Sequence, residues 1–175
     1  ALFSPRLAVW FIVFGSVRRS SPSSTRKGSS AASDVYKSQV RQCYKLGIPL
    51  KTRHREVAPN QYEFAPLFGS VITQTDQNLV VMQICEEVAA KHGLAALLQE
   101  KPFAGVNGSG KHNNWSISTL CGAQLLNPGD LTKRSGNPEL FPIVMSALVA
   151  AVDEYGDLMR LAIASPGNDF RLGAM

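Results

Sequence analysis

A glycine-rich stretch, KPFAGVNGSGKHNNWS at residues 101–116, constrains the folding of this chain more than any other segment. Three glycines interrupt it, at Gly105, Gly108 and Gly110. Glycine gives the backbone access to turns that other residues rarely adopt, so main-chain amides there can approach a bound anion closely. Lys111 and His112 add a point charge and a side chain that can ligate a metal. We therefore expect a ligand-binding loop, with a strand behind it at 113–117.

The loop also matches a second pattern. Gly105 to Lys111 fits the phosphate-loop sequence G-x-x-x-x-G-K. That motif needs a Ser or Thr next, whose hydroxyl meets magnesium, and a helix that begins there. His112 stands in the hydroxyl position, and the residues after it favour a strand over a helix. A P-loop-like nucleotide-binding protein through Gly105–Lys111 stays as one alternative, and a non-catalytic interaction module as another.

Charge is unevenly distributed along the chain. The formal net charge of the 175 residues is +5, but the surplus lies before Asp34, and acidic and basic residues balance after it. Basicity therefore gives little support for nucleic-acid binding. The apolar run from Leu7 to Val17 is too short to span a bilayer, so we expect no membrane partner. Three widely spaced cysteines predict reduced, buried thiols and no zinc site: Cys43, Cys85 and Cys121.

Residues 1–33 are expected to lie outside the folded domain. Their apolar run precedes a tract rich in Ser, Arg and Gly, a composition that favours disorder. An Arg-rich, acid-poor front end is also typical of organellar targeting segments, and an upstream splice or translation artefact is the other interpretation. We set the domain boundary at Asp34, with residues 34–175 as the domain. A cytoplasmic protein is expected, unless the front segment directs import into an organelle.

Behind Asp34 the hydrophobic pattern predicts helices alternating with strands. Helices are expected at 34–47 and 73–93, and strands at 48–54, 62–67, 94–98 and 113–117. A Gly- and Pro-rich loop then leads to a further helix, with Asn137 as its cap and Pro142 as the sign of a kink or a later start. This alternation favours an α+β fold.

Three motifs resemble one known family. The stretch at 101–116 resembles the glutamate- and ATP-binding loop of glutamine synthetases and is similar in full to their type III class. RHREVAPNQYEFAP, at 53–66, resembles the metal-binding segment of that family, and GNDFRLGA, at 167–174, resembles a third motif. The resemblance implies the central part of the catalytic domain, truncated at both ends. Such a domain has a mostly antiparallel, curved sheet with packed helices.

The resemblance implies a site for Mg²⁺ or Mn²⁺. Glu56 and Glu63 match two glutamates that share one cation, and His112 matches the ligand of a second cation. Carboxylate oxygens suit these hard cations, which also bind nucleotide phosphates. Without that context, two glutamates seven residues apart near a turn would be read as solvated surface charges.

Substrate contacts are implied as well. Asn107 and Gly108 match residues that hold the amino-acid substrate, and Arg171 matches an arginine that binds its carboxylate, for which a planar guanidinium is suited. Ser116 matches a serine near the nucleotide. At Asn114 many relatives carry a histidine; asparagine can donate a hydrogen bond there but brings no charge.

The implied activity is that of a glutamate–ammonia ligase, which amidates glutamate through γ-glutamyl phosphate. Glutamate, ammonium and ATP would be the substrates, and the full-length parent would form a homo-oligomeric ring. Positioning and charge neutralisation carry most of such phosphoryl transfer. The family's ammonium-site glutamate would lie beyond Met175. No catalytic residue is therefore assigned, and the chain alone is expected to be inactive.

Overall fold

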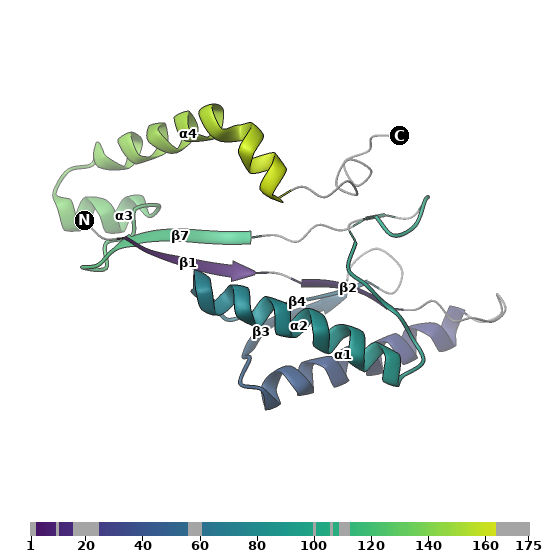
Figure 1. Ribbon diagram of the computed structural model, residues 1–175. Coiled ribbons are helices and arrows are strands. Elements are labelled where there is room, and N and C mark those ends of the chain that lie inside the picture. The colour runs from purple at the N-terminus through teal and green to yellow at the C-terminus, as the bar shows by residue number, and fades with distance from the viewer. Residues whose placement is uncertain are drawn as a thin grey trace.

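The computed structural model describes the backbone of residues 3–9, 11–15, 25–55, 61–99, 101–105, 107–108 and 113–163. Every structural statement below concerns these residues. Within them the chain is an α+β protein in which strands form two antiparallel sheets and four helices flank them (Figure 1). The expected fold class is confirmed.

The strands order as β5-β1-β7 in one sheet and β3-β4-β2-β6 in the other, and every pairing is antiparallel. Their bounds are Phe3–Val9 for β1, Phe11–Gly15 for β2, Leu50–Arg55 for β3, Gln61–Pro66 for β4, Gly69–Ser70 for β5, Ala96–Leu97 for β6 and Asn113–Thr119 for β7. The strands predicted at 48–54, 62–67, 94–98 and 113–117 are confirmed to within a few residues.

The register shows how the glycine-rich loop joins the sheets. β1 pairs with β5 and β7, whereas β2 pairs with β4 and β6, and β4 runs into β5 after two residues. On the other side of the β1–β2 segment, Val9 pairs with Asn113 and Phe14 pairs with Leu97. The segment between β6 and β7 therefore starts at a strand paired with β2 and ends at a strand paired with β1, so each sheet anchors one of its ends.

Two long helices, α1 (Thr25–Lys45) and α2 (Val71–Lys91), pack against the strands and each other (Figure 1). Ser70 caps α2, because its side-chain oxygen accepts from the Thr73 amide at 3.2 Å. The core between helices and strands is aliphatic and aromatic, with these buried members: Val35, Val40, Cys43, Ile48, Leu50, Phe64, Val81, Ile84, Cys85, Val88 and Ala89. Burial of this cluster is the main source of stability for the described part of the fold.

The described part of residues 1–33 belongs to the fold, although the sequence predicted that this segment lies outside the folded domain. β1 and β2 both come from this segment, and α1 begins at Thr25, so the helix runs across the boundary expected at Asp34. The apolar run is rich in aromatic and β-branched residues, which suit paired strands. Extending an existing helix is also easier than nucleating one, so a polar tract can continue a helix that packing stabilises.

A short helix, α3 (Pro128–Ser135), was not predicted. Asn127 caps it by accepting from the Asp130 amide at 3.1 Å, Pro128 opens it, and it ends at Gly136 with a φ of +69°. Cap, first-turn proline and terminal glycine are the ordinary signals of a helix, and all three stand in the sequence. The cap predicted at Asn137 belongs to the next helix: its side-chain oxygen accepts from the Glu139 amide at 2.9 Å, in the turn just before that helix.

The last helix, α4, spans Leu140–Ile163 and bends where Tyr155 departs from helical geometry, at φ −110° and ψ 15°. The later start that Pro142 suggested is confirmed, because this proline lies in the first turn, where its missing N–H does no harm. α4 packs beside α3 and leaves much apolar surface exposed, as at Val149 and Leu158. No helix in the described ranges is long and apolar enough to cross a membrane.

Candidate functional site

Glu63 occupies the middle of β4. It pairs with Ile12 of β2 on one side and with His54 of β3 on the other. Its neighbours Tyr62 and Phe64 contact the ring of Tyr36 on α1, so they point to the helix side of the sheet. Because side chains alternate along a strand, Glu63 points to the opposite face.

The Glu63 side chain is buried, with only 5% of the residue exposed. A solvated surface glutamate, the default interpretation of the sequence alone, is therefore wrong for this residue. Burying an ionised carboxylate is unfavourable unless charge or hydrogen bonds compensate it. A buried carboxylate on a strand fits the oxygen donor that Mg²⁺ or Mn²⁺ prefers. Its chemistry and its burial are both compatible with the predicted cation.

The glycine-rich loop starts two strands away from Glu63. β2 pairs with β4 through Ile12 and with β6 through Phe14, and the loop follows β6. Adjacent strands are spaced by roughly 4.8 Å, so β4 and β6 are roughly 10 Å apart across the sheet.

Within the loop, the expected backbone conformation is confirmed at Gly105, which has a φ of +70°. A side chain there would meet no neighbour, so the requirement for glycine comes from the backbone alone. Asn107 is exposed and Gly108 is half-buried. Both predicted substrate contacts are therefore accessible from solvent.

β7 follows the loop and carries the two predicted nucleotide contacts. Asn114 is exposed and Ser116 is half-buried, and alternation places both on one face of the strand. Trp115 lies on the other face and is 50% exposed. The P-loop alternative lacks support, because a strand stands where that motif needs a helix.

Five residues singled out in the sequence as part of the loop or the site lie outside the described ranges: Glu56, Gly110, Lys111, His112 and Arg171. Their roles stay predictions. Among the side chains that the structure describes, no group of three or more His, Cys, Asp and Glu residues comes together. Glu63 is thus the one predicted metal ligand whose surroundings the structure describes.

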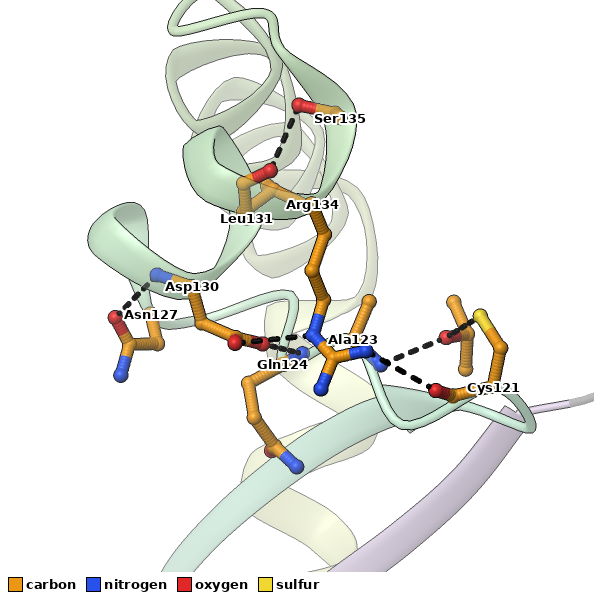
Figure 2. Close-up of polar contacts among 9 residues, drawn as sticks. Cys121, Ala123, Gln124, Asn127, Asp130, Leu131, Arg134 and Ser135 are labelled. Atoms are coloured by element: carbon orange, nitrogen blue, oxygen red, sulfur yellow. Dashed lines mark hydrogen bonds and ion pairs between the residues drawn. The ribbon is translucent and has the colours of Figure 1, made fainter.

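The turn that ends β7 is held by a polar network centred on Asp130 (Figure 2). One carboxylate oxygen accepts from the Gln124 amide at 2.8 Å, and the other accepts from Arg134 Nε at 3.0 Å. Arg134 also donates to the Cys121 carbonyl at 3.3 Å. The network ties the start of α3 to the end of the strand that carries Asn114 and Ser116.

The cysteines divide into two groups, all with free thiols. Cys43 and Cys85 are buried as expected, and burial raises the pKa of Cys43 to about 11. Burial, followed by the charge of Cys43, raises the pKa of Cys85 further. Cys121 is exposed, which the sequence did not predict, and the hydroxyl of Thr119 lowers the pKa of this thiol. Cys121 lies in a turn outside the core, so the burial statistics of cysteine do not apply to it.

Asp130 makes stability depend on pH. The Gln124 amide and then Arg134 hold the pKa of this carboxyl below its ordinary 3.8. The unfolded chain therefore takes up the proton first, so the stabilisation is complete above about pH 4 and is lost as pH falls through the folded pKa. We expect Asp130→Asn to lower the melting temperature at about pH 6, with a difference from wild type that narrows below about pH 4.

The control for this prediction is Asp34→Asn, which removes an exposed carboxylate 3.7 Å from Lys37 Nζ. Exposed pairs of this kind contribute little to stability, so its melting curve should follow wild type at each pH. A difference between Asp130→Asn and wild type that stays constant with pH would contradict the role given to the Asp130 charge.

Comparison with known proteins identifies the family of this chain. The family model for the glutamine synthetase catalytic domain matches residues 16–135. The chain belongs to the glutamine synthetase family. It is 52% identical over 131 residues to the type-3 glutamine synthetase of Dictyostelium discoideum, and 49% identical over 133 residues to a glutamine synthetase of Bacteroides fragilis. The predicted family and its type III class are confirmed.

Those matches cover 75% and 76% of this chain but only 17% and 18% of the two glutamine synthetases. The chain therefore spans less than a fifth of their length. Among solved structures, it is similar to GmaS without ligand, with a TM-score of 0.62, 22% identity and coverage of 71% of this chain and 32% of GmaS. A similarity at this identity shows the fold alone.

Proposed function

We propose that this chain forms part of the active site of an ATP-dependent ligase that joins ammonia to glutamate. The observation that carries the proposal is the position of Glu63, a buried carboxylate two strands away from the base of the loop that holds the NGSGKH motif. Glutamine synthetases in general use ATP and a divalent cation, and two motifs of this chain match their ligand-binding segments. The burial of Glu63 and the two sequence motifs thus support a ligand site formed by β4 and the glycine-rich loop.

In this proposal Glu63 and Glu56 hold one cation, of Mg²⁺ or Mn²⁺, and His112 holds a second. When bound, such cations neutralise negative charge on the nucleotide phosphates and on the substrate carboxylate. Glu63 supplies carboxylate oxygen from a strand fixed on both sides, and its burial keeps water away from that oxygen.

The remaining predicted residues bind and orient substrates. Asn107 and Gly108 hold the amino acid, Arg171 pairs with its carboxylate, and Asn114 and Ser116 contact the nucleotide. The γ-carboxylate oxygen of glutamate then forms a bond to the γ-phosphorus of ATP while the bond to ADP breaks. Ammonia next attacks the acyl carbon of γ-glutamyl phosphate, the bond from that carbon to the phosphate oxygen breaks, and inorganic phosphate leaves while the nitrogen releases a proton. Assembly of the full-length parent into a homo-oligomeric ring belongs to the same proposal.

Titration with Mn²⁺ and with a fluorescent ATP analogue tests this function. Glu56→Gln is expected to weaken Mn²⁺ binding by about tenfold or more, and Lys111→Ala is expected to leave it in place. Loss of nucleotide binding alone, through Lys111, would instead support a phosphate-loop protein. Absence of both cation and nucleotide binding in wild type would support a non-catalytic module.

A further inference from the structure

Tyr36 of α1 contacts three successive residues of β4. Its hydroxyl donates a hydrogen bond to the main-chain oxygen of Glu63 at 3.1 Å. Its ring stacks on Tyr62, with 5.0 Å between centroids and 23° between planes, and tilts against Phe64 at 5.9 Å. The residue in the middle of this contact is the predicted metal ligand.

These contacts act on Glu63 through the backbone. The Tyr62 and Phe64 rings lie on the helix side of β4, whereas the Glu63 side chain points to the other face. Fixing the two flanking side chains and the carbonyl between them restricts rotation of the Glu63 peptide. That restriction in turn fixes the direction of its Cα–Cβ bond. Functional groups need positions within about 0.5 Å of the productive geometry, so such restraint matters for a ligand.

We propose that Tyr36 is a positioning residue for the Glu63 carboxylate. It orients the carboxylate for a divalent cation from the opposite face of the sheet, without touching the cation. The inference rests on the proposed function, because orientation matters only if Glu63 binds the cation. None of the three motifs that resemble the family includes Tyr36, and its sequence surroundings, DVYKSQV, read only as part of an amphipathic helix.

A matched pair of variants tests the inference. Tyr36→Phe removes the hydroxyl and keeps the ring. Tyr44→Phe removes a comparable hydroxyl from the same helix, one that donates to the Leu50 carbonyl of β3 at 3.2 Å. We expect Tyr36→Phe to raise the Kd for Mn²⁺ about two- to tenfold, the effect of one hydrogen bond, and Tyr44→Phe to leave it unchanged. Electron paramagnetic resonance of free Mn²⁺ gives the Kd, and thermal melting reports stability.

A second variant examines the ring. Tyr36→Leu loses the contacts with Tyr62 and Phe64 as well as the hydroxyl, so we expect a larger rise in the Kd for Mn²⁺ than in Tyr36→Phe. If Tyr36→Phe and Tyr44→Phe lower the melting temperature alike and neither changes the Kd, the role of Tyr36 is structural only and the inference is overturned. Glu63→Gln distinguishes this outcome from a failure of the proposed function. If Glu63→Gln binds Mn²⁺ like wild type, Glu63 does not hold the cation and the proposed function is contradicted.

Hydrogen exchange on the wild-type chain decides the question if the Tyr36 variants do not fold. Coupling between two sites is reciprocal, so a cation that gains from the Tyr36 contact must also stabilise that contact. We expect saturating Mg²⁺ to slow amide exchange in β4 and in the turn of α1 around Tyr36, but not around Tyr44. Slowing in β4 with no change at Tyr36 would overturn the inference.

Discussion

Glu63→Gln is expected to weaken Mn²⁺ binding by about tenfold or more and to leave the fold intact. Glutamine has nearly the same shape as glutamate and can still accept hydrogen bonds, but it brings no negative charge to a cation. The side chain is buried, so the near-identical shape of glutamine should preserve the packing around it. Binding is measured by electron paramagnetic resonance of free Mn²⁺.

Glu86→Gln is the control for that prediction, since Glu86 is an exposed glutamate on α2. This variant should bind Mn²⁺ like wild type. If both variants lose affinity equally, cation binding reflects general surface charge and the specific role of Glu63 is wrong.

Phe64→Ala is expected to lower the free energy of unfolding by about 3–5 kcal/mol. Phe64 is fully buried, at 0% exposure, in the core that α1 and α2 share with β4. Truncation removes apolar contacts and leaves a cavity between helices and sheet, which the surrounding backbone fills only in part. Domains of this size have total stabilities of about 5–15 kcal/mol, so this loss is a large share of the total. Urea unfolding followed by circular dichroism gives the difference.

Phe68→Ala provides the comparison for Phe64→Ala, because Phe68 is 59% exposed. Most surface substitutions change stability by within about 0.5 kcal/mol, so this variant should unfold close to wild type. Equal losses in both variants would mean that the core does not centre on Phe64.

Local sequence signals predicted much of this fold. Apolar periodicity located α2, β3 and β4, and the glycines located the loop, with the positive φ confirmed at Gly105. The early start of α1 was missed because packing can extend a helix into a tract that composition alone assigns to disorder. α3 was missed although its cap and proline stand in the sequence, because a helix of eight residues with one buried residue, Leu131, gives little apolar periodicity.

The site was less accessible to sequence reasoning. The motif indicated Glu63 as a ligand, but its burial and its distance from the loop follow from strand register, which pairs residues far apart in the chain. Tyr36 gave no signal, since its contact with the Glu63 carbonyl needs a helix and a strand placed together by the fold. The same holds for Asp130 and Arg134, whose network depends on the turn after β7.

The most direct test of the proposed metal site is an anomalous-diffraction map of the protein crystallised with Mn²⁺. We expect a peak about 2.1 Å from a carboxylate oxygen of Glu63, with Glu56 as a further ligand of the same cation. A map from crystals saturated with Mn²⁺ that shows peaks only at exposed carboxylates, and none beside Glu63, would contradict the proposed metal site.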